Sequence, residues 1–322
     1  MTKADENGVQ QPLDMGMFEV LSVCALLCSS DVIAAISMVN YNEQPKLFSI
    51  VYGEGVFNDI VSIILFNTVQ SFKTNFDFTA TTPFEILGSF LALALESVGI
   101  GIFFGVFSSL MFKWFRFLTH SAITETLLLI IIAFLAYFIS EALELSGIIS
   151  LLTCGISMAH YTWYNLSPQG KTISSVAVSI LGSAAESLVF SYIGLCTFTY
   201  ASDQQNGDYP WSLSFILVMM SIIIVGRLTA VWGVHFALSL CSKEKDITIP
   251  ELAFISYGGM IRGAIAFGLV LKIPEGDDGT GEFRERGVIV TTTLAVVIIT
   301  TVIFGSFMPL VQKLLMGDSK QP

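Results

Sequence analysis

Long runs of mostly apolar residues recur along the whole chain, and they limit its possible folds more than any other feature. A helix needs ~20 such residues to cross the hydrocarbon core of a bilayer. Only 13% of the residues are charged, compared with ~25% in soluble proteins. The runs also lack the polar stripe that a soluble helix presents to water. The sequence therefore predicts an all-α polytopic membrane protein.

Turn-forming and charged residues divide the apolar sequence into about nine predicted transmembrane helices. Their bounds are 17–39, 47–72, 84–112, 122–140, 145–161, 172–200, 211–241, 250–272 and 287–315. With this number of helices, the two termini lie on opposite sides of the membrane. Eight Lys and Arg residues then fall on the side of the C-terminus and five on the other side. The positive-inside rule therefore predicts a cytoplasmic C-terminus.

Charge and composition argue against several other classes of protein. A formal net charge of −11 argues against nucleic acid as a partner. The spacing of the five cysteines fits neither a disulfide framework nor a zinc site. The three histidines lie near helix ends, and the sequence has no Ser-His-Asp arrangement or phosphate-binding loop. We therefore expect neither an enzyme nor a bound cofactor.

Two arginines, Arg227 and Arg262, lie inside predicted transmembrane helices. A charge at mid-bilayer costs at least ~2.5–3.5 kcal/mol on insertion scales, so each arginine needs a partner. Four acids lie within apolar runs: Asp31, Glu54, Asp59 and Glu186. Glu96 also lies in an apolar run, and Glu125 lies near a helix end, where it can reach the interface. A guanidinium can hold a carboxylate through two hydrogen bonds. We expect Glu54 to pair with Arg227, and Glu186 to be available for Arg262.

The densest polar cluster runs from Tyr52 to Asp59. On a helix, Glu54 and Asn58 share a face, whereas Glu54 and Asp59 lie ~140° apart. Desolvation disfavours the charged form of a carboxylic acid, so a buried one can hold either a proton or a monovalent cation. Asp59, beside Asn58, is therefore the candidate site for cation and proton, with oxygen ligands that suit Na⁺. The alternative is that Asp59 is only a hydrogen-bonded residue between helices.

Two predicted helices carry residues that favour a local break. Ser and Asp side chains at 28–32 compete for backbone hydrogen bonds, and three glycines within 257–264 surround Arg262. Transporters use such interrupted helices where freed carbonyls and helix ends meet the ion. Ser30 and Asp31 are therefore further candidate ligands, and Arg262 can neutralise helix ends. The alternative at 28–32 is a continuous helix with Asp31 facing a neighbouring helix.

The residues GEGVFND at 53–59, continued at 62–72, resemble the eukaryotic sodium/proton exchangers of the cation/proton antiporter superfamily. They look closest to the vacuolar and endosomal branch. The residues at 185–190 and 262–267 are similar to later motifs of the family. The resemblance covers about residues 17–315.

This resemblance implies electroneutral exchange of Na⁺ or K⁺ for H⁺ by alternating access in a homodimer. The transported ions are the only small-molecule partners that it implies. It implies that Asp59 carries ion and proton with Asn58 as its neighbour, and that Glu54 and Arg227 form a stabilising ion pair. The membrane would be that of an endosome or vacuole, or the plasma membrane.

The resemblance also implies an inverted-repeat fold with two interrupted crossover helices. After a polar N-terminal segment at 1–16, the helices at 17–72 would form the first repeat with the ion site. Those at 84–200 would be a linker helix and dimerisation-type helices. The helices at 211–315 would form the second repeat, and 316–322 a short cytosolic tail.

Three features depart from the family pattern. The match lacks the first helices of the family, and Val32 stands where many members have proline. One extra residue also separates Gly258 and Gly259 from Arg262. A second interpretation is therefore a truncated, non-transporting isoform, or a regulatory subunit of a full-length exchanger.

Overall fold

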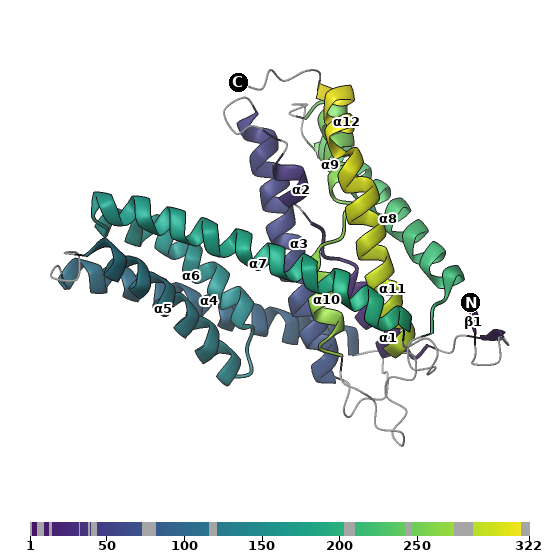
Figure 1. Ribbon diagram of the computed structural model, residues 1–322, viewed down its shortest axis with the longest axis horizontal. Helices are drawn as coiled ribbons and strands as arrows, with labels where there is room; N and C mark the ends of the chain where they lie inside the picture. The colour runs from purple at the N-terminus through teal and green to yellow at the C-terminus, as the bar shows by residue number, and fades with distance from the viewer. Residues whose placement is uncertain are drawn as a thin grey trace. The chain divides into compact units, whose positions relative to one another are not determined.

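The fold is helical, which confirms the predicted class (Figure 1). The computed structural model describes residues 2–4, 10–12, 15–31, 33–37, 39, 44–72, 82–115, 121–202, 210–241, 247–273 and 286–316. A short hairpin stands at the N-terminus, in which β1 (Thr2–Ala4) pairs antiparallel with β2 (Gln10–Pro12). It belongs to the predicted polar segment at 1–16. The predicted tail beyond Met316 lies outside the described residues.

The helices follow one another along the chain as labelled in Figure 1. They are α1 (Met17–Leu26), α2 (Ile33–Ile36), α3 (Pro45–Phe72), α4 (Thr82–Trp114), α5 (Ala122–Ala142), α6 (Gly147–Tyr161), α7 (Pro168–Ser202), α8 (Leu213–Cys241), α9 (Ile249–Gly258), α10 (Ala264–Val270), α11 (Arg286–Ile299) and α12 (Gly305–Met316). A 3₁₀-helix, η2 (Thr162–Asn165), follows α6, and a π-helix, η4 (Thr300–Phe304), joins α11 to α12.

Six stretches of the described chain are long and apolar enough to cross a membrane. They are Pro45–Gln70, Phe84–Trp114, Ala122–Ala142, Pro168–Tyr200, Leu213–Ser239 and Arg286–Leu315. The other predicted transmembrane helices, at 17–39, 145–161 and 250–272, are shorter or interrupted in the structure. The total of nine crossings therefore stays a prediction.

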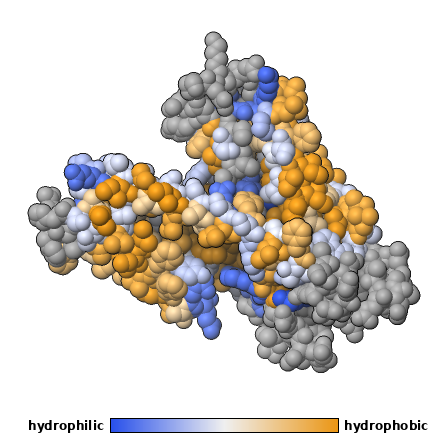
Figure 2. Space-filling view, in the orientation of Figure 1, coloured by the Kyte–Doolittle hydropathy of each residue, from blue (hydrophilic) through white to orange (hydrophobic). Residues whose placement is uncertain are grey.

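Large apolar side chains are exposed on the long helices, as the orange areas of Figure 2 illustrate. Phe198 and Trp114 are each 79% exposed, and Leu188 is 71% exposed. Soluble proteins rarely expose wide apolar patches. An apolar exterior on such helices is what the hydrocarbon of a bilayer requires, and the chain is an integral membrane protein.

Two of the predicted helices are interrupted at the expected places. The first ends as α1 at Leu26 and resumes as α2 at Ile33. The second ends as α9 at Gly258 and resumes as α10 at Ala264. The polar and glycine-rich residues between them are not helical where the structure describes them, and Val32 lies outside those residues.

The chain divides into two compact units. The first comprises Met1–Lys73 and Ser191–Pro322, and the second comprises Thr74–Phe190. The predicted repeats at 17–72 and 211–315 both fall in the first unit. Most of the predicted linker and dimerisation region makes up the second.

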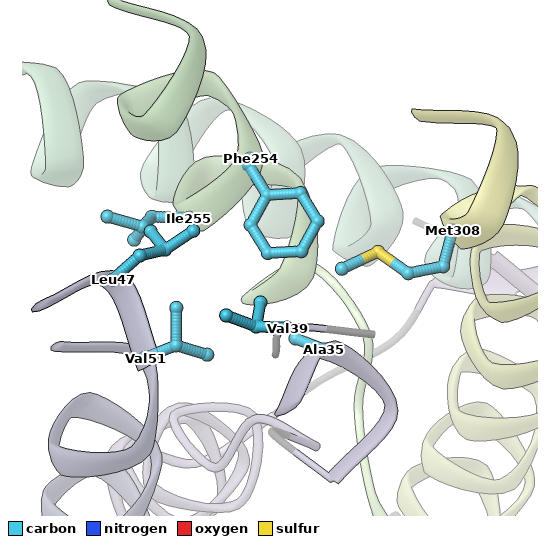
Figure 3. Packing of buried hydrophobic residues seen from close by; sticks show 7 residues of the cluster. All are labelled: Ala35, Val39, Leu47, Val51, Phe254, Ile255 and Met308. Atoms are coloured by element: carbon cyan, nitrogen blue, oxygen red, sulfur yellow. The ribbon is translucent and has the colours of Figure 1, made fainter. Parts of the chain in front are cut away.

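The core of the first unit joins one half-helix of each interruption, α2 and α9, to α3 and α12 (Figure 3). Its buried members are Ala35, Val39, Leu47, Val51, Phe254, Ile255 and Met308. Gly258, at the end of α9, lies against this cluster, because a Cβ there would come within 2.9 Å of the Ala35 Cβ. Close packing on both sides thus fixes where the interruptions lie relative to α3.

Small and hydroxyl-bearing residues hold the second unit together. A Cβ at Gly105 would overlap the Ser157 side chain, so α4 and α6 approach closely there. The buried Ser140 hydroxyl donates to Ser150 Oγ at 2.6 Å, and Ser150 Oγ donates to the Ser97 carbonyl at 2.8 Å. These bonds satisfy polar groups that neither lipid nor an apolar core can satisfy.

Glu125 is fully buried in the second unit, contrary to the expectation that it reaches the interface. Its carboxylate accepts hydrogen bonds from Ser167 Oγ at 2.7 Å and from the Ser167 backbone N–H at 3.3 Å. Ser167 precedes the first residue of α7, where helix N–H groups need acceptors. Gly170 is required nearby, because a Cβ there would overlap the carboxylate. Glu125 therefore holds the start of α7 against α5.

Candidate ion-binding site

The helix α3 directs its two central acids to different neighbours. Asn58 Nδ2 donates to Glu54 Oε1 at 3.1 Å, as expected for residues one turn apart. Asp59 Oδ1 instead accepts a hydrogen bond from Ser29 Oγ at 2.7 Å. Glu54 and Asp59 therefore sit in separate environments, although only five positions separate them.

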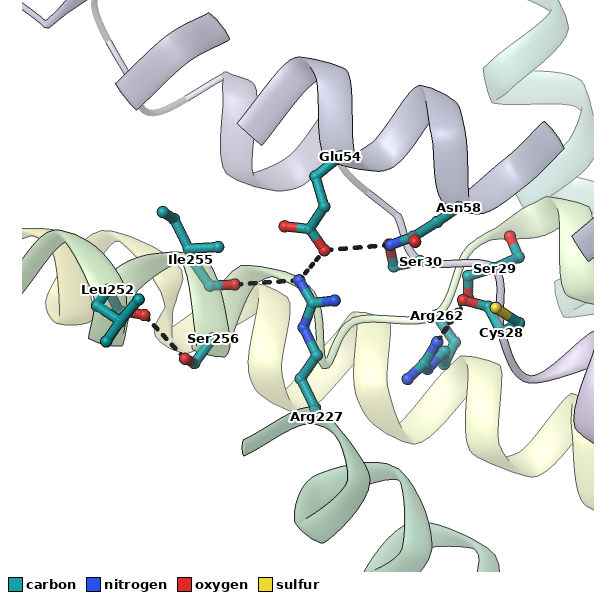
Figure 4. A network of polar contacts seen from close by, with 10 residues as sticks. All are labelled: Cys28, Ser29, Ser30, Glu54, Asn58, Arg227, Leu252, Ile255, Ser256 and Arg262. Atoms are coloured by element: carbon teal, nitrogen blue, oxygen red, sulfur yellow. Dashed lines mark hydrogen bonds and ion pairs between the residues drawn. The ribbon is translucent and has the colours of Figure 1, made fainter. Parts of the chain in front are cut away.

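Glu54 is neutralised by an arginine, as its predicted pairing requires. Its carboxylate forms an ion pair with the Arg227 guanidinium, which α8 supplies (Figure 4). Arg227 Nη2 also donates to the Ile255 carbonyl near the end of α9, at 3.4 Å. A Cβ at Gly259 would overlap the guanidinium, so glycine leaves the space in which the guanidinium lies. The pair satisfies two charges that would otherwise be unfavourable within the bilayer.

Side chains of α3 also bind the first interruption. The Asn58 amide donates a second hydrogen bond to Ser30 Oγ at 3.1 Å, so its two N–H donors link Glu54 to Ser30. Further along α3, Ser62 Oγ donates to the Ala25 carbonyl at 2.6 Å. Together with the bond from Ser29 to Asp59, these contacts hold the segment after α1 against α3.

Arg262 lies against the non-helical segment that follows α1. Its guanidinium donates to the Cys28 carbonyl at 3.1 Å and to the Ser29 carbonyl at 2.9 Å (Figure 4). The residue is only 6% exposed. Both carbonyls lie just beyond α1, in the segment between α1 and α2. Two main-chain oxygens thus accept from Nη1 of the buried cation, while its Nε has no hydrogen-bond partner among the described residues.

The two interruptions are joined through the main chain. The backbone N–H of Asp31 donates to the carbonyl of Ile261 at 2.8 Å. A Cβ at Gly263 would lie 3.1 Å from the Asp31 Cβ, so glycine permits this approach. Asp31 lies two residues after Ser29, whose hydroxyl binds Asp59.

The structure gathers the predicted ion ligands of the first unit into one region. These residues are Ser30, Asp31, Asn58 and Asp59. Glu186 is exposed on α7 in the second unit, and its predicted role as a partner of Arg262 stays a prediction. Sequence reasoning missed Ser29 as a ligand of Asp59. Its position beside Ser30 was the available signal, but adjacency alone does not decide which hydroxyl faces the carboxylate.

The fold and the site together define the class of protein. It is an integral membrane protein with charges buried between two interrupted helices. The chain belongs to the sodium/hydrogen exchanger family, whose transmembrane region matches residues 8–313. Sodium/hydrogen exchanger 2 of Arabidopsis thaliana is 32% identical over 91% of this chain and 54% of the plant protein.

Two further relatives show the same coverage. Sodium/hydrogen exchanger 1 of Oryza sativa is 31% identical over 96% of this chain and 58% of its own length. Sodium/hydrogen exchanger 8 of Mus musculus is 30% identical over 95% of this chain and 51% of its own length. The chain therefore spans about half the length of the curated relatives it matches.

Proposed function

We propose that this protein exchanges Na⁺ or K⁺ for H⁺ across a membrane, with Asp59 carrying cation and proton in turn. The observation that carries this proposal is the separation of roles on α3. Asp59 faces the first interruption, beside Ser29 and near Asp31, while Glu54 is bound to Arg227. The names of its relatives, which are sodium/hydrogen exchangers, support the same activity.

The chemistry follows from the oxygen atoms around Asp59. Hard cations prefer oxygen ligands, and carboxylate and hydroxyl oxygens surround this position. The Asn58 amide uses its N–H donors on Glu54 and Ser30, so it retains a carbonyl oxygen as an acceptor. Asn58 adds no titratable group. One proton or one monovalent cation on Asp59 leaves the same net charge, and the exchange is therefore electroneutral.

Alternating access requires that the site be reached from each side in turn. In this proposal the two interruptions, joined at Asp31 and Ile261, move together with α3 as the ion-carrying part. The protein acts as a homodimer with its C-terminus in the cytoplasm. It resides in the endosomal or vacuolar membrane, or in the plasma membrane. The alternative function is a regulatory membrane subunit with the same fold and no transport.

Flux through the purified protein in proteoliposomes tests the proposal. An imposed pH gradient should drive uptake of ²²Na⁺ or ⁸⁶Rb⁺, and Asp59→Asn should abolish it. Glu96→Gln is the matched control, since Glu96 is an acid within an apolar helix of the second unit and is exposed. Equal flux by wild type and Asp59→Asn would remove Asp59 as the carrier. A silent wild type would favour the regulatory subunit.

A further inference from the structure

The helix formed by α11 and α12 changes its hydrogen-bonding pattern beside the second interruption. Thr300–Phe304 forms the π-helix η4, and the ribbon continues through it in Figure 1. A π-helical turn bonds each N–H to the carbonyl five residues earlier, and such turns are frequent at functional sites. The Gly305 N–H is directed at the Thr300 carbonyl in this way. The widened turn changes which polar groups of the helix are free for other partners.

The end of the π-helix provides an acceptor for the residue before the break. Phe304 is the last residue of η4. The hydroxyl of Tyr257 donates to the Phe304 carbonyl at 2.9 Å. Tyr257 is the penultimate residue of α9. This bond therefore fixes the near side of the second interruption.

The start of the π-helix provides an acceptor for a residue within the break. The buried Thr300 hydroxyl accepts a hydrogen bond from the Arg262 backbone N–H at 3.1 Å and donates to the Val296 carbonyl at 2.8 Å. Arg262 lies in the non-helical segment, where no helical carbonyl serves its N–H. One threonine side chain thus replaces the missing helical acceptor.

The segment held at these two points determines the geometry around Asp59. Arg262 binds the Cys28 and Ser29 carbonyls through its side chain, and Ser29 binds Asp59. A displacement of Arg262 would therefore move the residue that donates to the carrier.

We propose that Thr300 and Tyr257 are positioning residues for the ion site. Their hydroxyls bind the end of α9 and the middle of the second interruption to the π-helix, and so set the position of Arg262 and Ser29 without contacting the ion. This inference rests on the proposed function for its effect on transport. The effect of these two hydrogen bonds on the interruption, which we call the clamp, can be measured independently of transport.

The test compares four variants in nanodiscs and proteoliposomes. Thr300→Val keeps the shape of the side chain but removes the acceptor, whereas Thr300→Ser keeps it. Thr301→Val is the matched control, because the Thr301 hydroxyl binds the Val297 and Ile298 carbonyls of its own helix. Tyr257→Phe removes the other bond with little change in volume. Hydrogen–deuterium exchange of residues 259–263 and the cation concentration for half-maximal flux are measured for each.

Thr300→Val and Tyr257→Phe should each accelerate hydrogen–deuterium exchange of residues 259–263 by about tenfold, as expected for one lost buried hydrogen bond. Each should also raise the half-saturating cation concentration by about tenfold, for the same reason. Thr300→Ser and Thr301→Val should match wild type in both measurements. If Thr300→Val and Tyr257→Phe exchange hydrogen at the same rate as Thr301→Val, the two bonds do not hold the interruption and the clamp is overturned. Faster hydrogen exchange with unchanged cation dependence would overturn the positioning role. If wild type shows no flux, the proposed function and this role in transport fail together, and hydrogen exchange alone still decides the clamp.

Discussion

The hydroxyl of Ser29 donates a hydrogen bond to Oδ1 of Asp59 over 2.7 Å, which connects the first interruption to the centre of α3. The bond occupies one lone pair of the carboxylate and fixes its rotation. A bound cation can then use the second oxygen, Oδ2, or share Oδ1 with the hydroxyl. Ser29 therefore controls how the carboxylate is presented, and the following predictions begin with this residue.

Ser29→Ala should weaken cation binding. Without the donor, the Asp59 carboxylate loses a hydrogen bond to a charged group, worth ~1.5–3 kcal/mol, and becomes free to rotate. We expect a rise of about tenfold in the cation concentration for half-maximal flux, measured in proteoliposomes at constant pH. Ser29→Thr, which retains a hydroxyl, should stay near wild type. An unchanged Ser29→Ala variant would contradict this role.

Asn58→Asp should destabilise the protein. An ionised aspartate has no N–H to donate, so both the bond to Glu54 Oε1 and the bond to Ser30 Oγ are lost. The new charge would also face the Glu54 carboxylate. We expect a loss of roughly 2 kcal/mol, visible as a lower Tm in detergent. The same change at Asn67, further along α3, is the control.

Glu54→Gln should destabilise the fold by leaving the Arg227 charge without its partner. Breaking a buried ion pair costs ~3–5 kcal/mol, and we expect up to about 3 kcal/mol here because the side chains are 26% and 12% exposed. Removing both charges in Glu54→Gln/Arg227→Met should restore part of the Tm. A double variant less stable than either single one would show that the pair is not the source of the loss.

Gly259→Ala should disrupt the same ion pair from the other side. The added Cβ would overlap the guanidinium of Arg227, which must then shift from its place between Glu54 and the Ile255 carbonyl. We expect a drop in Tm smaller than that of Glu54→Gln, and no further drop when the two are combined. Gly268→Ala is the control, because a Cβ at Gly268 meets nothing within 4 Å. Additive effects would place Gly259 outside the ion-pair network.

Much of the polar arrangement on α3 followed from residue types and spacing. Charges are so rare in the apolar helices that few partners are available for each, which is why Glu54 and Arg227 could be paired. The four-residue spacing placed Glu54 and Asn58 on one face. The interruptions followed from residues that compete for, or release, backbone hydrogen bonds.

Contacts that use main-chain acceptors could not be predicted in the same way. Every residue carries a carbonyl, so nothing in the sequence marks Cys28 and Ser29 as acceptors for Arg262. The expectation for Arg262 was helix ends, whereas the carbonyls that it contacts lie just beyond α1. The burial of Glu125 was also missed, because its acceptor role depends on where α7 begins.

The bond from the Asp31 N–H to the Ile261 carbonyl has a consequence for how the protein tolerates substitution. Any residue but proline supplies that N–H, and any residue supplies that carbonyl. Alanine variants of the other residues in both interruptions would therefore keep the two bonding groups, whereas Gly263→Ala would place a Cβ 3.1 Å from the Asp31 Cβ. An amide-to-ester replacement at residue 31 would remove the N–H alone and so expose how much the connection contributes.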